Sequence, residues 1–168
     1  MLIDEIIDFC DDHYKSQNTK CVWHNCNHQD KCSGSSKQCL KEIHFPDKYP
    51  IAKKEYDCCN LINIYVCDYT HKYAYEMLYL LRESGTLKEM YSYHIMSIGC
   101  GAAPNLIAFE QHIRESQSLK TIYYWCIDKK ELWQPVHDVI EKYMSKIVRK
   151  SKFKNADAIE LCNQKHQP

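Results

Sequence analysis

His94-Ile-Met-Ser-Ile-Gly-Cys-Gly-Ala-Ala-Pro-Asn-Leu-Ile-Ala-Phe109 is the stretch of sequence that decides the fold. The run 93–98 is short and apolar and predicts a buried strand, whereas residues 104–115 carry the apolar spacing of a helix. Gly99 and Gly101 stand between them, and glycine accepts positive φ angles and lets a ligand approach the backbone closely. The sequence therefore predicts a strand–turn–helix unit whose helix N-terminus favours a partial negative charge.

A second strand and helix follow this unit. Residues 121–127 are rich in β-branched and aromatic side chains, which predicts a strand, and Pro135 suits the first turn of a helix that extends to about Lys150. Strands alternating with helices indicate parallel strands joined by right-handed crossovers. Asp128 closes the second strand, where a carboxylate can accept ribose hydroxyls. We therefore expect the glycine turn and Asp128 to face one small ligand.

Two short motifs in these strands resemble those of a known family. Ile98-Gly-Cys-Gly-Ala-Ala103 resembles the first motif of class I S-adenosylmethionine-dependent methyltransferases, and Ile127-Asp128 resembles their second motif. The resemblance implies that the turn contacts the methionine part of the cofactor and that the acid holds the ribose. Ser97 stands where the family usually has an acid, and Ala103 stands where it has a third glycine. The cofactor-binding residues implied by the resemblance are Ser97, Gly99, Cys100, Gly101, Ala102, Asp128 and Lys129.

Other nucleotide-binding turns fit this stretch less well. A dinucleotide fingerprint has glycine where this chain has Pro104, and the Gly-Lys-Ser/Thr of a P-loop is absent. A plain α/β turn with two glycines and a site for a different nucleotide both stay open. Methyl transfer depends mostly on positioning, so the sequence names no catalytic residue and no methyl acceptor.

The segment 18–45 has a different composition and no lasting periodicity. Zinc takes four tetrahedral thiolate or imidazole ligands and would order such a loop. Unligated cysteines and an iron–sulfur cluster are the alternatives. The predicted zinc ligands are Cys21, Cys26, Cys32 and Cys39, with His28 as an alternate.

The sequence thus predicts an α/β protein with a partial Rossmann-like, methyltransferase-type parallel sheet, preceded by helices and a Cys-rich loop. Residues 1–90 form the helical region, with amphipathic patterns over 2–15 and 55–84. Residues 91–150 form the Rossmann-like half, and residues 151–168 are expected to be a flexible tail. The alternative function is a non-catalytic, zinc-organised protein-interaction module with a degenerate Rossmann half.

Only two strands are predicted, whereas a complete methyltransferase domain of this class has a much larger sheet. A two-stranded parallel unit is marginal on its own. We expect the chain to be a fragment, or to be completed by a second chain or a dimer partner. Either case predicts exposed apolar surface beside the strands.

Composition limits the partners and the compartment. The 22 basic and 22 acidic residues balance, so nucleic acid and anionic membranes are not indicated. No apolar run reaches the roughly 18–20 residues that span a bilayer, and acids follow Met1 where a signal peptide is basic. These features predict a cytoplasmic protein. Eleven cysteines then indicate metal ligation or buried thiols, and Cys100 and Cys126 are expected to be packing residues.

Overall fold

The computed structural model describes residues 1–14, 40–41, 43–45, 47–48, 56, 58–84, 91–117 and 119–164. It confirms the predicted N-terminal helix, the long second helix and both predicted strand–helix pairs, but the last of these helices ends at Tyr143 and not near Lys150, where a strand has already begun. In chain order the elements are α1 (Leu2–His13), α3 (Cys59–Ser84), β1 (Ser92–Ile98), α4 (Pro104–Glu115), β2 (Thr121–Asp128), the 3-10 helix η1 (Glu131–Trp133), α5 (Gln134–Tyr143), β3 (Val148–Asn155) and α6 (Ala158–Gln164).

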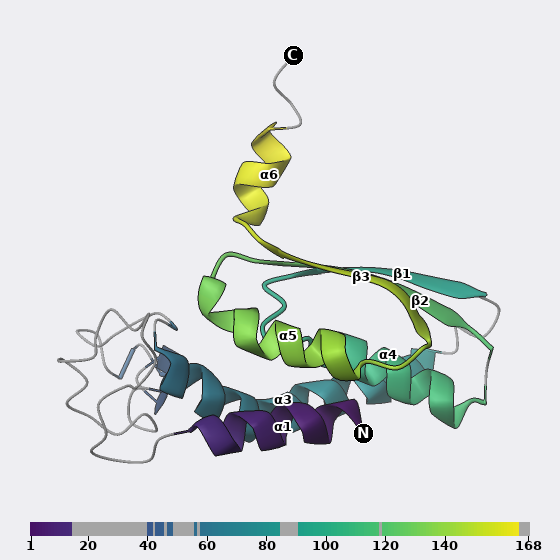
Figure 1. The fold of residues 1–168 in the computed structure, drawn as a ribbon, viewed down its shortest axis with the longest axis horizontal. Helices are drawn as coiled ribbons and strands as arrows, with labels where there is room; N and C mark the ends of the chain where they lie inside the picture. The colour runs from purple at the N-terminus through teal and green to yellow at the C-terminus, as the bar shows by residue number, and fades with distance from the viewer. Residues whose placement is uncertain are drawn as a thin grey trace.

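The strands form one parallel sheet in the order β1-β2-β3. Because parallel neighbours need a crossover, α4 joins β1 to β2, and η1 with α5 joins β2 to β3. Figure 1 shows α1, α3, α4 and α5 all on the same side of the sheet, while α6 extends away from it. The chain is therefore an α/β protein with a three-stranded parallel sheet flanked by helices, which is compatible with a Rossmann-like unit.

The third strand corrects the prediction of a flexible tail over residues 151–168. β3 pairs with β2 from Val148 to Asn155 with one irregularity at Arg149, and α6 follows it after a short turn. Its sequence alternates, with Lys150, Lys152 and Lys154 on one face and Phe153 packed against the core on the other. The prediction counted the charge of this segment and missed its period of two, which is the signal of a half-exposed strand.

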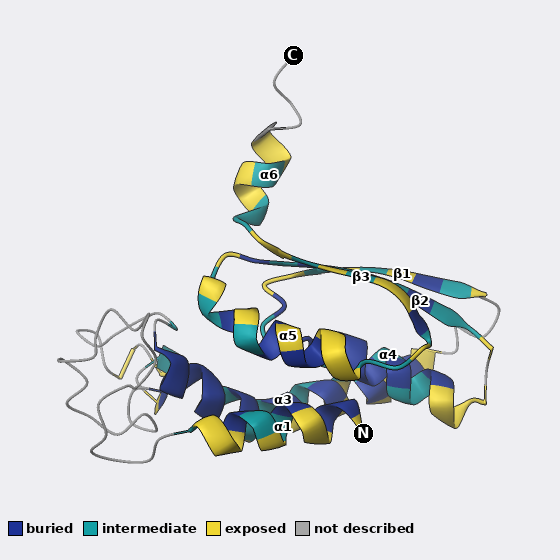
Figure 2. Ribbon diagram, in the orientation of Figure 1, coloured by how far each residue is buried: buried dark blue, intermediate teal, exposed yellow. Residues whose placement is uncertain are grey.

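The covered face of the sheet carries the core. Ile122, Tyr124 and Cys126 of β2 are at most 1% exposed and point toward the helices. α4 packs against α3, and α1 packs against both α3 and α5. Figure 2 shows the buried residues concentrated between these layers. α3 is the longest helix that the structure describes, yet none of the described helices combines the length and the apolarity needed to cross a bilayer.

The other face of the sheet is open among the described residues. The register places His94 beside Tyr123 and Lys150, and the next row places Met96 beside Trp125 and Lys152. Met96 is 68% exposed and Ile98 is 64% exposed. The expected apolar surface beside the strands is therefore present, and a row of lysines flanks it.

Candidate functional site

The glycine turn has the backbone that its sequence predicts. Gly99 and Gly101 have φ angles of +64° and +48°, in the left-handed region that favours glycine. A Cβ at Gly99 would meet nothing within 4 Å, so the backbone angle is the reason for that glycine. At Gly101 a Cβ would also come within 3.4 Å of the Trp133 ring. The turn therefore requires both glycines, and it ends at Pro104, the first residue of α4.

Asp128 and the turn are in direct contact. The Gly101 backbone N–H donates to Asp128 Oδ2 at 3.0 Å, and the Lys130 N–H donates to Asp128 Oδ1 at 3.0 Å. The carboxylate is 8% exposed, and these two bonds offset the cost of burying it. Each carboxylate oxygen has a second acceptor site that a ligand hydroxyl can use. The predicted convergence of turn and acid is therefore present.

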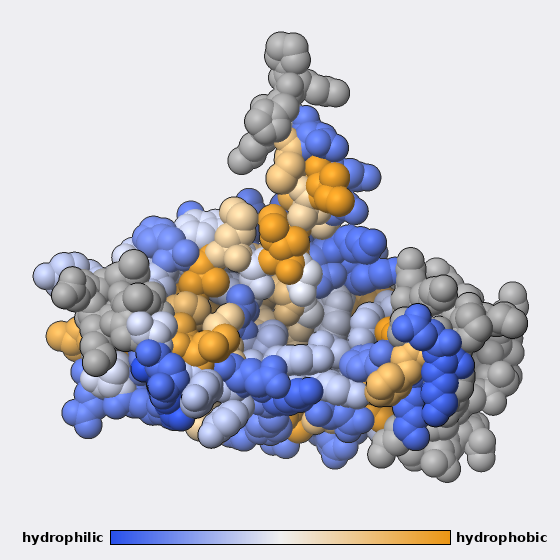
Figure 3. All heavy atoms as spheres, turned by 180° about the vertical axis from the view of Figure 1, so that it is seen from behind, coloured by the Kyte–Doolittle hydropathy of each residue, from blue (hydrophilic) through white to orange (hydrophobic). Residues whose placement is uncertain are grey.

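A cavity of about 830 Å³ opens beside this contact, at the carboxyl ends of the strands. The turn and the end of β2 form one side, α3 and η1 form another, and residues 156–159 close a third. Figure 3 shows hydrophobic atoms at the base of α6, the part of that helix that lines the cavity. In parallel α/β sheets, ligands bind in this position, outside the carboxyl ends of the strands.

Six of the seven predicted cofactor-binding residues line this cavity. Ser97 is the exception, because its side chain lies on the covered face and hydrogen-bonds with Tyr124. In place of the family's acid, this position therefore holds a hydroxyl that contacts the core. The six that line the cavity are Gly99, Cys100, Gly101, Ala102, Asp128 and Lys129.

An aromatic wall that the sequence did not predict lines the same cavity. Tyr56, Tyr65, Tyr73 and Trp133 line the cavity. Tyr65 meets Trp133 edge-on at 5.9 Å between ring centroids and Tyr56 at 5.1 Å. Burial raises the pKa of Tyr56 to about 12, so its hydroxyl stays protonated at neutral pH. The clustering of tyrosines along α3 was the signal in the sequence, but only the fold shows which ring faces the turn.

Thr70 contributes an unusual polar atom to the same wall. The residue is 2% exposed and lines the cavity. Among the described residues, its Oγ1 has no hydrogen-bond partner. A buried hydroxyl without a partner costs about 1–3 kcal/mol, and a ligand in the cavity that accepts or donates a hydrogen bond would remove that cost. Thr70 Oγ1 is therefore a hydrogen-bonding group that a ligand in the cavity can use.

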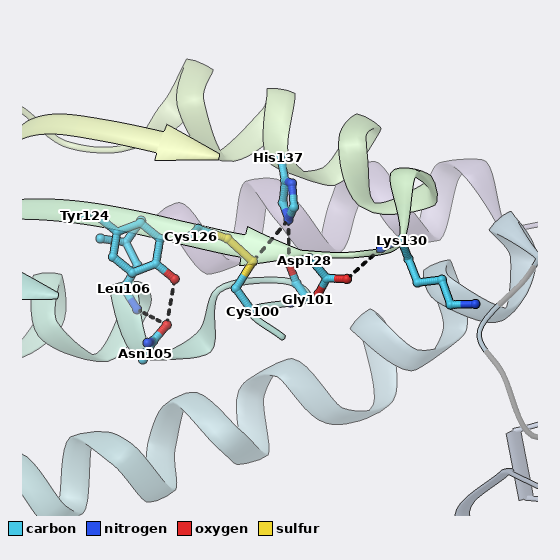
Figure 4. Close-up of a disulfide and its surroundings, with 9 residues drawn as sticks. All are labelled: Cys100, Gly101, Asn105, Leu106, Tyr124, Cys126, Asp128, Lys130 and His137. Atoms are coloured by element: carbon cyan, nitrogen blue, oxygen red, sulfur yellow. Dashed lines mark hydrogen bonds between the residues drawn. A yellow bond between two sulfur atoms is a disulfide. The ribbon is translucent and has the colours of Figure 1, made fainter. Parts of the chain in front are cut away.

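The sequence predicted that Cys100 and Cys126 are simple packing residues, and the structure corrects this prediction. They form a disulfide between the turn and β2, with 5.9 Å between their Cα atoms. His137 of α5 lies above them, and its Nε2 is 2.8 Å from the Gly101 carbonyl oxygen and 3.7 Å from Cys100 Sγ. Burial lowers the pKa of His137, which is therefore neutral at pH 7. Figure 4 shows this group beside Asp128 and Gly101.

The predicted zinc ligands lie outside the described residues, so the fold does not test that site. They are Cys21, Cys26, His28, Cys32 and Cys39.

Comparison with known proteins leaves the family open. A scan against protein-family models finds no match, and searches of curated proteins and of solved structures find no significant match either. The functional argument therefore depends on the motifs and on the geometry of the cavity.

Proposed function

We propose that this chain is an S-adenosylmethionine-binding class I methyltransferase or part of one. The hydrogen bond from Gly101 N to Asp128 Oδ2 carries the proposal, because it joins the two motifs at the rim of one cavity. S-Adenosylmethionine would supply an activated methyl group, carried on a positively charged sulfonium. The methyl acceptor stays open.

The chemistry of the cavity supports this cofactor. Its volume of about 830 Å³ is in the range of sites that enclose small ligands. Asp128, at the carboxyl end of β2, suits ribose hydroxyls. The rings of Tyr65 and Tyr73 suit a cation, since aromatic faces attract positive charge. Thr70 Oγ1 supplies a further hydrogen-bonding group.

Calorimetric titration with S-adenosylmethionine tests the proposal. We expect binding in the micromolar range for the full chain. Asp128→Asn should weaken it at least tenfold, because the amide removes the charge and keeps one oxygen for the two N–H groups, of Gly101 and Lys130, from which Asp128 accepts. Asp138→Asn is the matched control, because Asp138 is an exposed acid of α5 outside the cavity.

Two further ligands make the result specific. S-Adenosylhomocysteine lacks the sulfonium charge, so weaker binding of this compound would support a role for the aromatic wall. NAD and ATP test the open possibility of another nucleotide. Binding of either one in preference to S-adenosylmethionine, or equal binding by Asp128→Asn, would contradict the proposal.

A non-catalytic interaction module is the second candidate function. The open sheet face favours it, because Met96 and Ile98 present apolar surface that a partner can cover. In this candidate, zinc bound by Cys21, Cys26, Cys32 and Cys39 organises the N-terminal segment, with His28 as an alternate ligand. Metal analysis of protein purified without chelator tests the zinc. Lack of cofactor binding by an intact, folded chain would favour this candidate.

We also propose that a second chain or a dimer partner completes the sheet beside β1. Among the described residues, β1 pairs with β2 alone, so the backbone groups of its outer edge are available for another strand. Hydrogen exchange at increasing protein concentration tests a dimer, since pairing would slow exchange of the β1 amides that point away from β2. If the exchange rate of these amides did not change with protein concentration, a dimer would be excluded and a different chain would be the proposed partner.

The predicted cytoplasmic location is part of the proposal. Its support is the composition of the sequence, and cell fractionation of the native protein tests it.

A further inference from the structure

Three metal-binding side chains meet beneath the glycine turn. Cys100 comes from the turn, Cys126 from β2 and His137 from α5. Their donor atoms all lie within 4.8 Å of one another, and each residue is at most 5% exposed. The proposed cofactor site uses the backbone around Cys100 but none of these three donor atoms.

The donor set suits a thiophilic metal ion. Thiolate and imidazole together select zinc and similar soft ions over magnesium or calcium. Two such donors on one tetrahedral zinc are expected about 3.5–3.8 Å apart, given bond lengths near 2.3 Å for sulfur and 2.0 Å for nitrogen. Cys100 Sγ and His137 Nε2 are 3.7 Å apart. This pair therefore already has the spacing of two ligands of one ion.

The two sulfur atoms allow two alternative states. In the disulfide they are bonded to each other and cannot ligate a metal as thiolates. A Cα separation of 5.9 Å also permits them to separate and share an ion when they are reduced, because side-chain rotation moves each sulfur without moving its strand. The disulfide form and the metal form therefore exclude each other.

We propose that the reduced pair Cys100 and Cys126, together with His137, binds one divalent ion of the zinc class. A dithiol reductant transfers two electrons and two protons to the disulfide, giving two thiols, and is itself oxidised to a disulfide. The metal ion then displaces both thiol protons and forms two metal–sulfur bonds.

His137 links this site to the glycine turn. Its Nε2 contacts the Gly101 carbonyl oxygen at 2.8 Å, as the N–H donor of a neutral ring. A metal ion on Nε2 requires the proton to be on Nδ1, so it releases that carbonyl. Phe153 packs against the imidazole with 4.6 Å between ring centroids and holds the ring in place. Metal binding is therefore expected to change the environment of Gly101, whose amide contacts Asp128.

Cobalt titration of the full, phosphine-reduced chain tests the site. Tetrahedral cobalt with thiolate ligands gives a sulfur-to-metal charge-transfer band. We expect Cys126→Ser to bind one equivalent of cobalt less than the wild type. The same difference should appear when Cys21, Cys26, Cys32 and Cys39 are all serine, which removes the predicted N-terminal site. Cys162→Ser is the matched control, because Cys162 is exposed and lies outside the cluster.

Two variants of His137 keep the test valid if Cys126→Ser does not fold. His137→Gln should weaken cobalt binding at least tenfold, whereas His137→Cys should retain one equivalent with a charge-transfer band that grows from two thiolates to three. Oxidation of the wild type to the disulfide should abolish binding at this site. Equal cobalt stoichiometry in the wild type and in folded Cys126→Ser would overturn the proposal, as would equal affinity in the wild type and His137→Gln.

Discussion

The two faces of the sheet are made by the same three strands and have opposite surroundings. On the covered face, Ile122 and Tyr124 are fully buried beneath the helices. On the open face, Met96 is 68% exposed, although it is an apolar residue. Period-two alternation places every second side chain on each face, so the difference comes from the layer that covers the face.

This difference indicates what the described part of the chain lacks. Parallel sheets are normally covered on both faces, and here all the packed helices lie on one side (Figure 1). The cavity is formed at the ends of the strands, so it depends on the turn, the end of β2, α3, η1 and residues 156–159 rather than on a second helical layer. Ile98 and Ile127, at the ends of β1 and β2, line the cavity, whereas Met96 and Trp125 do not, so variants at Met96 test the uncovered face separately from the ligand site.

The largest expected effect is a difference in stability between a variant on the covered face and a variant on the open face. Ile122→Ala should lower the free energy of unfolding by about 2–5 kcal/mol, because it leaves a cavity in the core. Met96→Ala, on the open face, should change it by less than about 0.5 kcal/mol. Urea unfolding of both variants measures the comparison. Similar losses in the two variants would mean that the open face is covered in solution.

Adjacent tyrosines provide a second, smaller comparison. Tyr124 points to the covered side, where its hydroxyl donates to Asn105 Oδ1 at 2.8 Å, whereas Tyr123 lies on the open face. Tyr124→Phe should cost about 1–2 kcal/mol, because it removes this hydrogen bond and the one with Ser97. Tyr123→Phe is the matched control and should cost less.

The pH dependence of the same pair has a definite sign. Burial raises the pKa of Tyr124 from 10.0 to about 12 in the folded chain. The unfolded state therefore loses this proton first, and stability falls as the pH rises from 10 to 12. That fall should be shallower in Tyr124→Phe than in Tyr123→Phe. Equal slopes in urea unfolding across this window would contradict the burial of the Tyr124 hydroxyl.

The features that depend on the local backbone could be predicted from the sequence. Gly99 and Gly101 are needed because of their φ angles, and Asp128 lies where its strand ends. The glycine turn and the acid could therefore both be predicted. The strand–helix alternation around them followed from periodicity. Each of these signals lies within a few residues of the feature that it predicts.

The remaining features depend on contacts between distant segments. The Cys100–Cys126 pair arises because parallel pairing brings the end of β1 beside β2. The aromatic wall arises because α3 packs below the turn, and amphipathic patterning does not specify which tyrosine faces a ligand. β3 was missed because its lysines suggested a solvated tail. Composition concealed a period of two that the sequence did contain.

The smallest expected effect on stability tests the open face directly. Met96→Lys should change the free energy of unfolding by less than about 0.5 kcal/mol, since the side chain is already 68% exposed. It should nevertheless reduce fluorescence of a hydrophobic dye, because the charge interrupts apolar surface beside Trp125. Leu119→Lys is the matched control, since Leu119 is 99% exposed and lies outside the strands. If both variants lowered the dye signal equally, the dye would be reporting general exposure, and the sheet face would have no distinct affinity for apolar ligands.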